Sequence, residues 1–448
     1  MYRNEDLMKI KSNLNKIQDD ASNEYKKLYE PTVDEIGQVY TAITNYVKRK
    51  KRIAYGGFAQ NTILIDKNPD ESFYKEVKGA YYKWPDIADI EFYSHTPVQD
   101  MIELTNELHS MGFKYIEGGE AIHPETFKIS VNFIIYCDIT YMPKNIYENI
   151  PTLNINNIIC AHPHFMMVDA YRILTDPMTS YFRLNKPIQR FPKLLKYYKI
   201  DMTDNIKIND KMADIKVMGV IYNILKQSKM VVVGFCAYNY YMKKVENAET
   251  IKIPFYEAIS MNLKKHTTII YKYLVKKFTN ITVKEYYPFF TFMDHRVEYY
   301  HNNILVLKLY GNNKRCTVYN YSEKKHMYFG TYNLIYMYLL FNYFNSIVMK
   351  DNLLDTIYKN LLYNINHARD RYLDSHNTTV VDKSPFQDFT TKCFGKPHEP
   401  SREAKEERIK NNYIPFVYKP YLKNNMIKEF TFSNSSGMMI TLKEDLII

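Results

Sequence analysis

The sequence lacks any long hydrophobic run, and its few cysteines follow no pattern. No apolar run reaches the roughly 18 residues that a membrane-spanning helix needs, so we expect no membrane span. The first residues, MYRNEDLMKIKSNLNK, have no apolar core and are not expected to form a secretory signal. The cysteines form no CxxC pair and lie near no histidine at zinc spacing; they are Cys137, Cys160, Cys236, Cys316 and Cys393. We expect free thiols in a reducing compartment and no zinc site.

Positive charge is in excess over the 448 residues. There are 60 Lys and Arg residues against 49 Asp and Glu, which gives a net charge of +11 and a pI near 9.0. Such a charge favours a polyanionic partner but says nothing about the fold. A hydrophobic content of 46% excludes disorder for most of the chain. At roughly 100–200 residues per domain, the length predicts two to four domains.

The pattern along the chain alternates between helical and mixed regions. The order that it predicts is a helical N-terminal region (1–50), a mixed region (51–150), a helical connecting region (151–228), a second mixed region (229–375), and a linker with a C-terminal tail (376–448). The basic run KRKKR at 48–52 could be a localisation signal or a nucleic-acid patch, although a solvated helix end is the commoner explanation. The last roughly 35 residues regain aromatic and β-branched character, and we expect them to dock on the body.

The first motif is AYGGFAQN at 54–61, where a predicted strand runs into two glycines and then a helix. Gly56 and Gly57 have no Cβ, so their backbone amides can approach a phosphate closely. A helix start adds further amides and a positive dipole end. By itself a Gly-Gly turn is more often structural.

The second motif is a set of three acids on predicted strands. Asp89 and Glu91 alternate along one strand and therefore share a face. Two carboxylates on one face repel each other, which a divalent cation would relieve, and Mg²⁺ prefers such oxygen ligands. Asp138 ends an apolar strand. The alternatives are two solvated charges on an edge strand and a strand-end acid that caps a turn.

The order of these pieces resembles the nucleotidyltransferase superfamily typified by DNA polymerase beta. The resemblance implies that Asp89, Glu91 and Asp138 are catalytic residues and bind two Mg²⁺ or Mn²⁺ ions. Glu91 stands where many members have Asp, which shifts the metal distances but keeps the charge. Aromatic residues near these acids could stack on bases, although two of them are more typical of a core: Tyr55, Tyr93, Phe58 and Phe92.

A closer resemblance is to the poly(A) polymerase catalytic subunits of large cytoplasmic DNA viruses, with the mimivirus-type enzymes nearest. It rests on YGGFAQN, ADIEFYS, CDIT and the segment at 167–193, and it covers about 45–345. It implies an α+β (mixed) fold with a catalytic domain, a degenerate second domain, and helical N-terminal and connecting segments. The nucleotide-binding candidates are Gly56, Gly57, Gln60, Asn61, Arg183, Lys186 and Arg190. The last three would share a helix face, but Pro187 and Pro192 argue against one straight helix.

The second mixed region repeats parts of the first. Residues 233–239 match 55–61 at Gly, Ala and Asn, and 252–256 match 89–93 at Ile, Phe and Tyr. In this alignment Lys252 and Pro254 replace both carboxylates. We therefore expect a duplicated fold without a metal site from about 230 to 345, and one active site within 51–145. Coincidence between two short stretches is the alternative.

The resemblance implies template-independent addition of AMP from ATP to the 3′ end of viral mRNA in the host cytoplasm, with possible packaging in the virion. Alternatives are another RNA-terminal nucleotidyltransferase and a non-catalytic RNA-binding scaffold. The implied partners are RNA and ATP, with no membrane. The chain would either form a homodimer or bind a separate processivity subunit that is also a cap methyltransferase, as in poxviruses.

Overall fold

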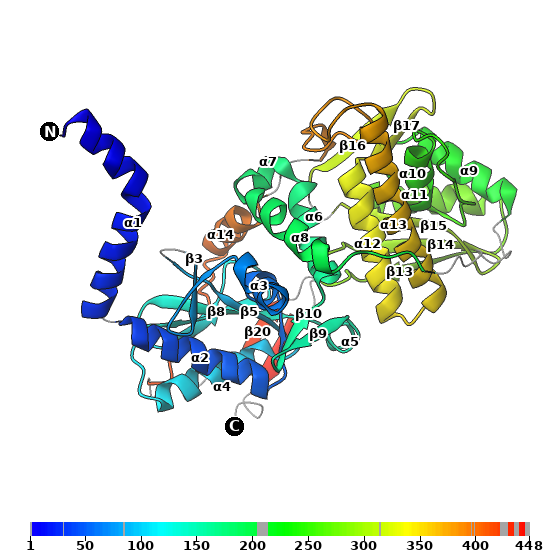
Figure 1. The fold of residues 1–448 in the computed structure, drawn as a ribbon. Helices are drawn as coiled ribbons and strands as arrows, with labels where there is room; N and C mark the ends of the chain where they lie inside the picture. Colours follow the sequence, from blue (N-terminus) through cyan, green and yellow to red (C-terminus); the bar gives the residue numbers. More distant parts are fainter. Residues whose placement is uncertain are drawn as a thin grey trace.

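The computed structural model describes residues 2–29, 31–83, 86–203, 214–312, 315–395, 397, 399–421, 429–433 and 439–443. The fold is mixed α/β, as predicted, and it has two sheet-containing domains with helices between them (Figure 1). Within the described residues, no helix is both long and apolar enough to cross a membrane.

An eight-stranded sheet forms the first domain. Its order is β19 (Val417–Tyr418), β6 (Glu117–Glu120), β7 (Thr126–Val131), β8 (Ile134–Tyr141), β5 (Ile90–Ser94), β1 (Ile53–Ala54), β10 (Ile158–Ala161) and β9 (Thr152–Ile155). β9 and β10 lie in the region predicted to be a helical connector, and they complete this sheet instead. A small separate sheet is inserted before β5; it consists of β2 (Lys75–Val77), β3 (Ala80–Lys83) and β4 (Asp86–Ile87).

Two helices flank the start of the first domain. α1 (Asn4–Leu28) projects away from the body (Figure 1), and α2 (Val33–Arg49) packs on it. Thr32 caps α2 by accepting a hydrogen bond from the backbone N–H of Glu35 at 3.2 Å. α3 (Gly56–Lys67), η1 (Pro69–Glu71), α4 (Pro97–Ser110) and α5 (Lys144–Tyr147) complete this part.

The KRKKR run at the end of α2 is tied to α4. Its basic side chains pair with acids spaced along that helix, in the pairs Arg49–Glu107 (2.5 Å), Lys50–Glu103 (2.5 Å) and Arg52–Asp100 (2.7 Å). Asp100 is 1% exposed, so this last pair is largely removed from water. The run therefore has a structural role, which disfavours both a localisation signal and a nucleic-acid patch.

A helical segment joins the two domains. It contains α6 (Pro163–Leu174), α7 (Pro177–Ser180), η2 (Tyr181–Arg183), α8 (Asn185–Tyr197) and α9 (Ile215–Lys226). α8 contains both Pro187 and Pro192, whereas Arg183 lies before it in η2. Arg183, Lys186 and Arg190 therefore do not share one helix, as the prolines had suggested.

The second domain repeats the topology of the first. Its sheet order is β13 (Ile281–Tyr286), β14 (Arg296–His301), β15 (Ile304–Gly311), β12 (Tyr256–Ser260), β11 (Val231–Val233), β17 (Met327–Gly330), β16 (Thr317–Ser322) and β18 (Cys393–Phe394). From β13 to β16 these strands correspond one by one to β6, β7, β8, β5, β1, β10 and β9. The helices α10 (Gly234–Met242), α11 (Leu263–Val275) and α12 (Tyr332–Val348) follow β11, β12 and β17, as α3, α4 and α6 follow their counterparts. The predicted duplication is therefore present in the fold.

The domains meet through equivalent helices. α6 and α12 each follow a parallel strand next to the centre of their sheet, and they pack against each other. Tyr171 stacks on Tyr336 with ring centroids 4.6 Å apart, and Phe165 meets Phe344 edge to face at 5.1 Å. α13 (Asn352–Ser375) covers α12 on its other side.

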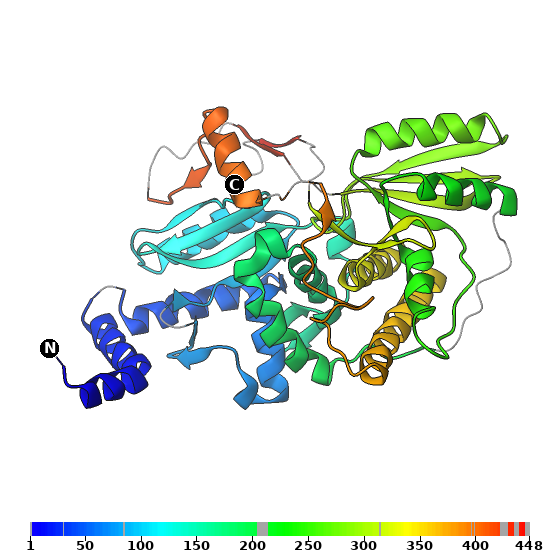
Figure 2. The ribbon, with the colours of Figure 1, turned by 90° about the horizontal axis from the view of Figure 1, so that it is seen from above.

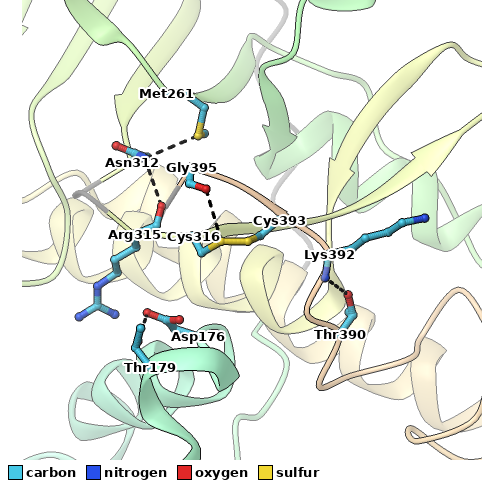
Figure 3. Close-up of a disulfide and its surroundings, with 10 residues drawn as sticks. All are labelled: Asp176, Thr179, Met261, Asn312, Arg315, Cys316, Thr390, Lys392, Cys393 and Gly395. Carbon is cyan, nitrogen blue, oxygen red and sulfur yellow. Dashed lines mark hydrogen bonds between the residues drawn. A yellow bond between two sulfur atoms is a disulfide. The ribbon is translucent and has the colours of Figure 1, made fainter. Parts of the chain in front are cut away.

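The C-terminal part returns to both domains (Figure 2). β18 pairs with β16, where Cys316 and Cys393 form a disulfide (Figure 3). The expectation of free thiols is therefore wrong for this pair, whereas Cys137, Cys160 and Cys236 are free and buried. α14 (Pro400–Lys410) leads to β19, which pairs with β6, and β20 (Glu429–Ser433) and β21 (Met439–Lys443) form a hairpin. The predicted docking of the tail occurs at β19.

Candidate active site

The two glycines of the first motif connect β1 to α3. Tyr55 extends the pairing of β1, because its backbone N–H donates to the backbone oxygen of Glu91 at 2.9 Å. Gly56 then has a φ of +63°, which side chains disfavour, and a Cβ there would lie 2.1 Å from Oε2 of Glu91. The N–H of Gly57 donates to the same oxygen at 2.5 Å. The turn therefore requires glycine at position 56 and fixes the carboxylate of Glu91.

The three predicted acids lie on two adjacent strands. Glu91 of β5 and Asp138 of β8 are directly paired in the parallel ladder. Asp89 precedes the first residue of β5 and is exposed, while Glu91 and Asp138 are half-buried. Asp138 lies in the middle of β8 rather than at a strand end, so the predicted position within the strand is wrong.

Burial and mutual repulsion disfavour ionisation of two of these acids. Burial raises the pKa of Glu91 to about 7; Asp138 adds to the shift and the N–H of Gly57 opposes it. Burial also raises the pKa of Asp138 to about 6; Asp89 adds to the shift and Lys128 opposes it. A nearby positive charge would favour the ionised forms of both carboxylates. Carboxylate oxygens are ligands that suit Mg²⁺ or Mn²⁺.

The side chains of the three predicted acids are not arranged around a common metal position. Within the described ranges, no three Asp, Glu, His or Cys side chains are gathered closely enough to hold a metal ion. The carboxylate of Glu91 is directed to the N–H of Gly57 instead. The donor chemistry fits a divalent cation, and binding one would require these carboxylates to turn toward it.

Arg190 is the predicted basic residue that approaches the glycine turn. A Cβ on Gly57 would lie 3.0 Å from Nη1 of Arg190 and 2.1 Å from the hydroxyl of Tyr74. The guanidinium donates to that hydroxyl at 3.1 Å and lies over the rings of Phe73 and Tyr74, 5.4 and 5.6 Å from their centroids. It also opposes the rise in the pKa of Glu91. Arg190 is thus held near Glu91, and the Tyr74 hydroxyl occupies the place that a Cβ of residue 57 would take.

The other two basic candidates precede Arg190 in the chain. Arg183 is exposed in η2, and it contributes to lowering the pKa of His123, which burial lowers most. Lys186 is exposed in the first turn of α8. No contact of Arg183 with the acids or the glycine turn occurs among the described residues. Their assignment to triphosphate or RNA binding stays a prediction.

Asn61 and Gln60 are both buried on α3. The side-chain oxygen of Asn61 accepts from the backbone N–H of Phe73 at 2.8 Å and from the Ser72 hydroxyl at 3.0 Å. Asn61 therefore anchors the loop that carries Phe73 and Tyr74. The side-chain oxygen of Gln60 has no hydrogen-bond partner in the described part of the chain. A nucleotide contact for either residue stays a prediction.

The nearby aromatic side chains are packed rather than free to stack on bases. Phe58, Phe92 and Tyr93 are at most 2% exposed. The half-buried Tyr55 stacks on Tyr93 with centroids 3.9 Å apart, and its hydroxyl lies 2.7 Å from that of Thr140. The expectation that Tyr93 could stack on a base is therefore wrong.

The second domain contains an equivalent turn without the chemistry. Gly234 has a φ of +60°, and a Cβ there would meet the carboxylate of Glu257. The backbone N–H of Phe235 opposes the rise in the pKa of Glu257, as the N–H of Gly57 opposes that of Glu91. The alignment of 252–256 with 89–93 is therefore wrong, because Glu257 and not Pro254 occupies the place of Glu91.

The residue paired with Glu257 in the sheet explains why the second domain lacks a pair of adjacent acids. Glu257 pairs in the ladder with Lys308, where Glu91 pairs with Asp138. The Tyr310 hydroxyl and the Asn342 amide both donate to Oε1 of Glu257, at 2.8 and 3.0 Å. Phe255 takes the place of Asp89, and its ring lies 5.1 Å from that of Phe235, which replaces Gly57. A lysine and two aromatic rings thus stand where the first copy has Asp138, Asp89 and Gly57.

Sequence reasoning missed Tyr74 and Lys128. Tyr74 lies in the loop before β2, and no motif marks it; only its contact with Arg190 does. Lys128 pairs with Asp138 across β7 and β8 and opposes the rise in its pKa. The alternation of β7 could have placed Lys128 on the face of the acids, had the register been known.

Comparisons with known proteins extend over the whole chain. Residues 41–180 match the family model "Poly(A) polymerase catalytic subunit", and residues 189–448 match "APMV, Putative poly(A) polymerase, catalytic subunit, C-terminal". A protein of Acanthamoeba polyphaga mimivirus with the name "Putative poly(A) polymerase catalytic subunit" is 28% identical over 500 aligned residues, covering 100% of this chain and 84% of that protein. A protein of the same name from African swine fever virus is 29% identical over 178 residues, covering 38% of this chain and 35% of its own length. The crystal structure of the Megavirus polyadenylate synthase superposes with a TM-score of 0.87 at 29% identity, covering 98% of this chain and 93% of that one.

Proposed function

The chain belongs to the family of poly(A) polymerase catalytic subunits, and from this premise we propose that it adds AMP from ATP to the 3′-hydroxyl of RNA without a template, releasing pyrophosphate. By family it is a polynucleotide adenylyltransferase, an enzyme class that uses ATP and a divalent metal. The proposed substrate is viral mRNA and the proposed place of action is the host cytoplasm. The observation that carries the proposal is the Gly56–Gly57 turn holding Glu91 directly beside Asp138.

In this proposal Asp89, Glu91 and Asp138 hold two Mg²⁺ or Mn²⁺ ions. When bound, such ions lower the pKa of the attacking hydroxyl and neutralise the leaving pyrophosphate. The N–H of Gly57 orients Glu91. The raised pKa values of Glu91 and Asp138 leave both carboxylates ready to exchange protons for a bound cation.

Arg190 is proposed to hold the triphosphate. Its guanidinium is fixed by the Tyr74 hydroxyl beside Gly57, and a planar fork of donors suits phosphate oxygens. Glycine at position 57 lets the Tyr74 hydroxyl and the guanidinium approach the turn closely, so a phosphate held by Arg190 would lie beside the backbone of the turn. Tyr74 would act as a positioning residue, because it holds the arginine without reaching the acids.

The decisive experiment incubates the purified chain with an RNA primer, Mg²⁺ and each of the four nucleoside triphosphates, followed by a denaturing gel. We expect extension with ATP. Asp89→Ala with Glu91→Ala should abolish extension by orders of magnitude, whereas Glu246→Ala with Glu249→Ala, two exposed acids of the second domain, should leave it unchanged. Preferred use of another nucleotide would indicate a different RNA-terminal nucleotidyltransferase. A scaffold would show no extension in any variant.

For the assembly we propose a homodimer. α1 projects from the body and leaves Leu7, Leu14 and Ile17 between 38% and 48% exposed along one face, spaced at intervals of seven and three residues. An apolar stripe of this kind supports pairing with a second copy, and a two-fold dimer is the commonest oligomer. Light scattering at micromolar concentration tests the proposal, and a monomer would favour a separate processivity subunit instead.

A further inference from the structure

The two copies of the duplicated fold differ most in charge at one helix. α4 follows β5 in the first domain and α11 follows β12 in the second, so the two helices occupy equivalent places. α4 presents acids that the basic end of α2 neutralises, among them Asp100 with Arg52. α11 and its flanks reverse this pattern, because residues 258–284 contain six lysines and no Asp or Glu.

The lysines of α11 are arranged on its outward face. Only Ile270 and Leu274 of this helix are buried against the sheet. Lys265, Lys272 and Lys276 are exposed and fall at i, i+7 and i+11, which places them together on the side opposite the buried pair. At 1.5 Å per residue, this line of charge is about 16 Å long.

No acid neutralises this line of lysines. No ion pair to any residue that the structure describes is formed by Lys265, Lys272 or Lys276. The helix lies at the outer edge of the second domain, away from α6 and α8 (Figure 2). The exposed face of α11 therefore carries a line of positive charge that a polyanion would match.

Aromatic rings flank the lysines. Tyr271 and Tyr273 are each 42% exposed on the two sides of the line. The Lys277 ammonium lies 4.6 Å from the ring centroid of Tyr273. Basic side chains interleaved with accessible aromatic rings are typical of surfaces that bind single-stranded nucleic acid, where bases stack and phosphates pair with lysine.

We propose that the outward face of α11 binds the RNA strand upstream of the 3′ end that enters the active site. This inference rests on the proposed function, because the polyanion is taken to be the RNA that the enzyme extends. The non-catalytic domain then retains a role as a holder of the growing strand. An acidic protein partner would fit the lysines but gives the exposed tyrosines no part in recognition.

The test removes the charge from the line. The variant Lys265→Gln, Lys272→Gln, Lys276→Gln is compared with wild type by fluorescence anisotropy of labelled single-stranded RNAs of increasing length. We expect roughly tenfold weaker binding of long RNA and unchanged binding of RNA too short to reach α11. The slope of the logarithm of the binding constant against the logarithm of the salt concentration should become shallower by about 2, because each of the three lost phosphate contacts contributes about 0.7. Replacing the same lysines by arginine should preserve binding.

A matched control separates this site from the overall charge. The variant Lys9→Gln, Lys16→Gln, Lys350→Gln removes three exposed lysines that lie neither on α11 nor on the apolar stripe of α1, and it should bind RNA as wild type does. Equal loss in both triple variants, or no loss in the α11 variant, would overturn the proposal, and the latter result would leave the face to a protein. Because binding is measured without ATP, its outcome is independent of AMP addition, which the primer-extension assay reports separately.

Discussion

Replacing Gly56 by alanine should damage both folding and catalysis, and Gly234 provides a matched control. Both glycines have φ near +60° and a glutamate carboxylate where a Cβ would stand. An L-residue pays about 1–2 kcal/mol for this backbone conformation. The Cβ adds a contact with Glu91 in one copy and Glu257 in the other that only movement of the carboxylate can relieve. We therefore expect each variant to lose at least this much free energy of unfolding.

The two substitutions should differ in activity. Gly56→Ala displaces Glu91 from the N–H of Gly57, and misplacement of a catalytic group by about 1 Å costs about 100-fold in rate. Gly234→Ala displaces a glutamate that has no catalytic neighbours, so primer extension at 20 °C should stay within about twofold of wild type. Calorimetry establishes that both variants are folded at that temperature. If folded Gly234→Ala lost as much extension as Gly56→Ala, or if Gly56→Ala kept its activity, the assignment of a single active site would be refuted.

Three further outcomes follow from the same contacts. Because Glu91 and Asp138 have raised pKa values in the folded protein, the metal-free protein should lose stability as pH rises from about 4 to 7. Mg²⁺ should therefore raise the melting temperature more at pH 8 than at pH 6. This expectation would be contradicted if calorimetry showed the same response to Mg²⁺ in the double variant Glu91→Gln, Asp138→Asn. Lys308→Met should cost about 3–5 kcal/mol by leaving Glu257 buried without its cation, and adding Glu257→Gln should recover part of that loss in urea denaturation. Asn61→Ala should cost about 1–3 kcal/mol, because a buried loop N–H loses its acceptor, and an unchanged urea midpoint would show that the anchor is dispensable.

The local arrangement of the candidate active site was predictable because short stretches of sequence determine it. A strand, two glycines and a helix start are recognisable within eight residues, and they led correctly to the turn between β1 and α3. The alternation of Asp89 and Glu91 needed only the period of a strand. Pairing of Glu91 with Asp138 needed the parallel alignment of β5 and β8, which short motifs do not contain. The superfamily resemblance supplied that missing long-range information.

The register of the second copy was not predictable for a physical reason. Glu91 follows Gly56 by 35 positions, whereas Glu257 follows Gly234 by 23, as the residue numbers give. The small sheet β2–β4 is inserted in the first copy only. The identical Ile, Phe and Tyr residues favoured an alignment of 252–256 with the strand at 89–93. In the structure, however, the pairing with β11 begins at Glu257. A strand that is buried on both faces has no alternation from which to fix its register.

The disulfide shows a second limit of the sequence. Cys316 and Cys393 are 77 positions apart, and their spacing carries no signal of pairing. They meet because β18 returns from beyond α13 to the edge strand β16. Only the path of the polypeptide, and not the composition of either segment, brings the two sulfur atoms together.

The charge at one ladder position separates the two copies. Burying a carboxylate is costly unless a positive charge or hydrogen bonds compensate it. The second copy supplies both within the chain: Lys308 stands beside Glu257, and Tyr310 and Asn342 donate to it. The first copy places Asp138 at the position of Lys308, so its glutamate gains repulsion where the other gains attraction. Arg190 and Lys128 offset this repulsion only in part, because the pKa values of Glu91 and Asp138 stay raised. The same backbone turn therefore holds a glutamate beside a lysine in one domain and beside a second carboxylate in the other, where a cationic ligand would stabilise the ionised acids.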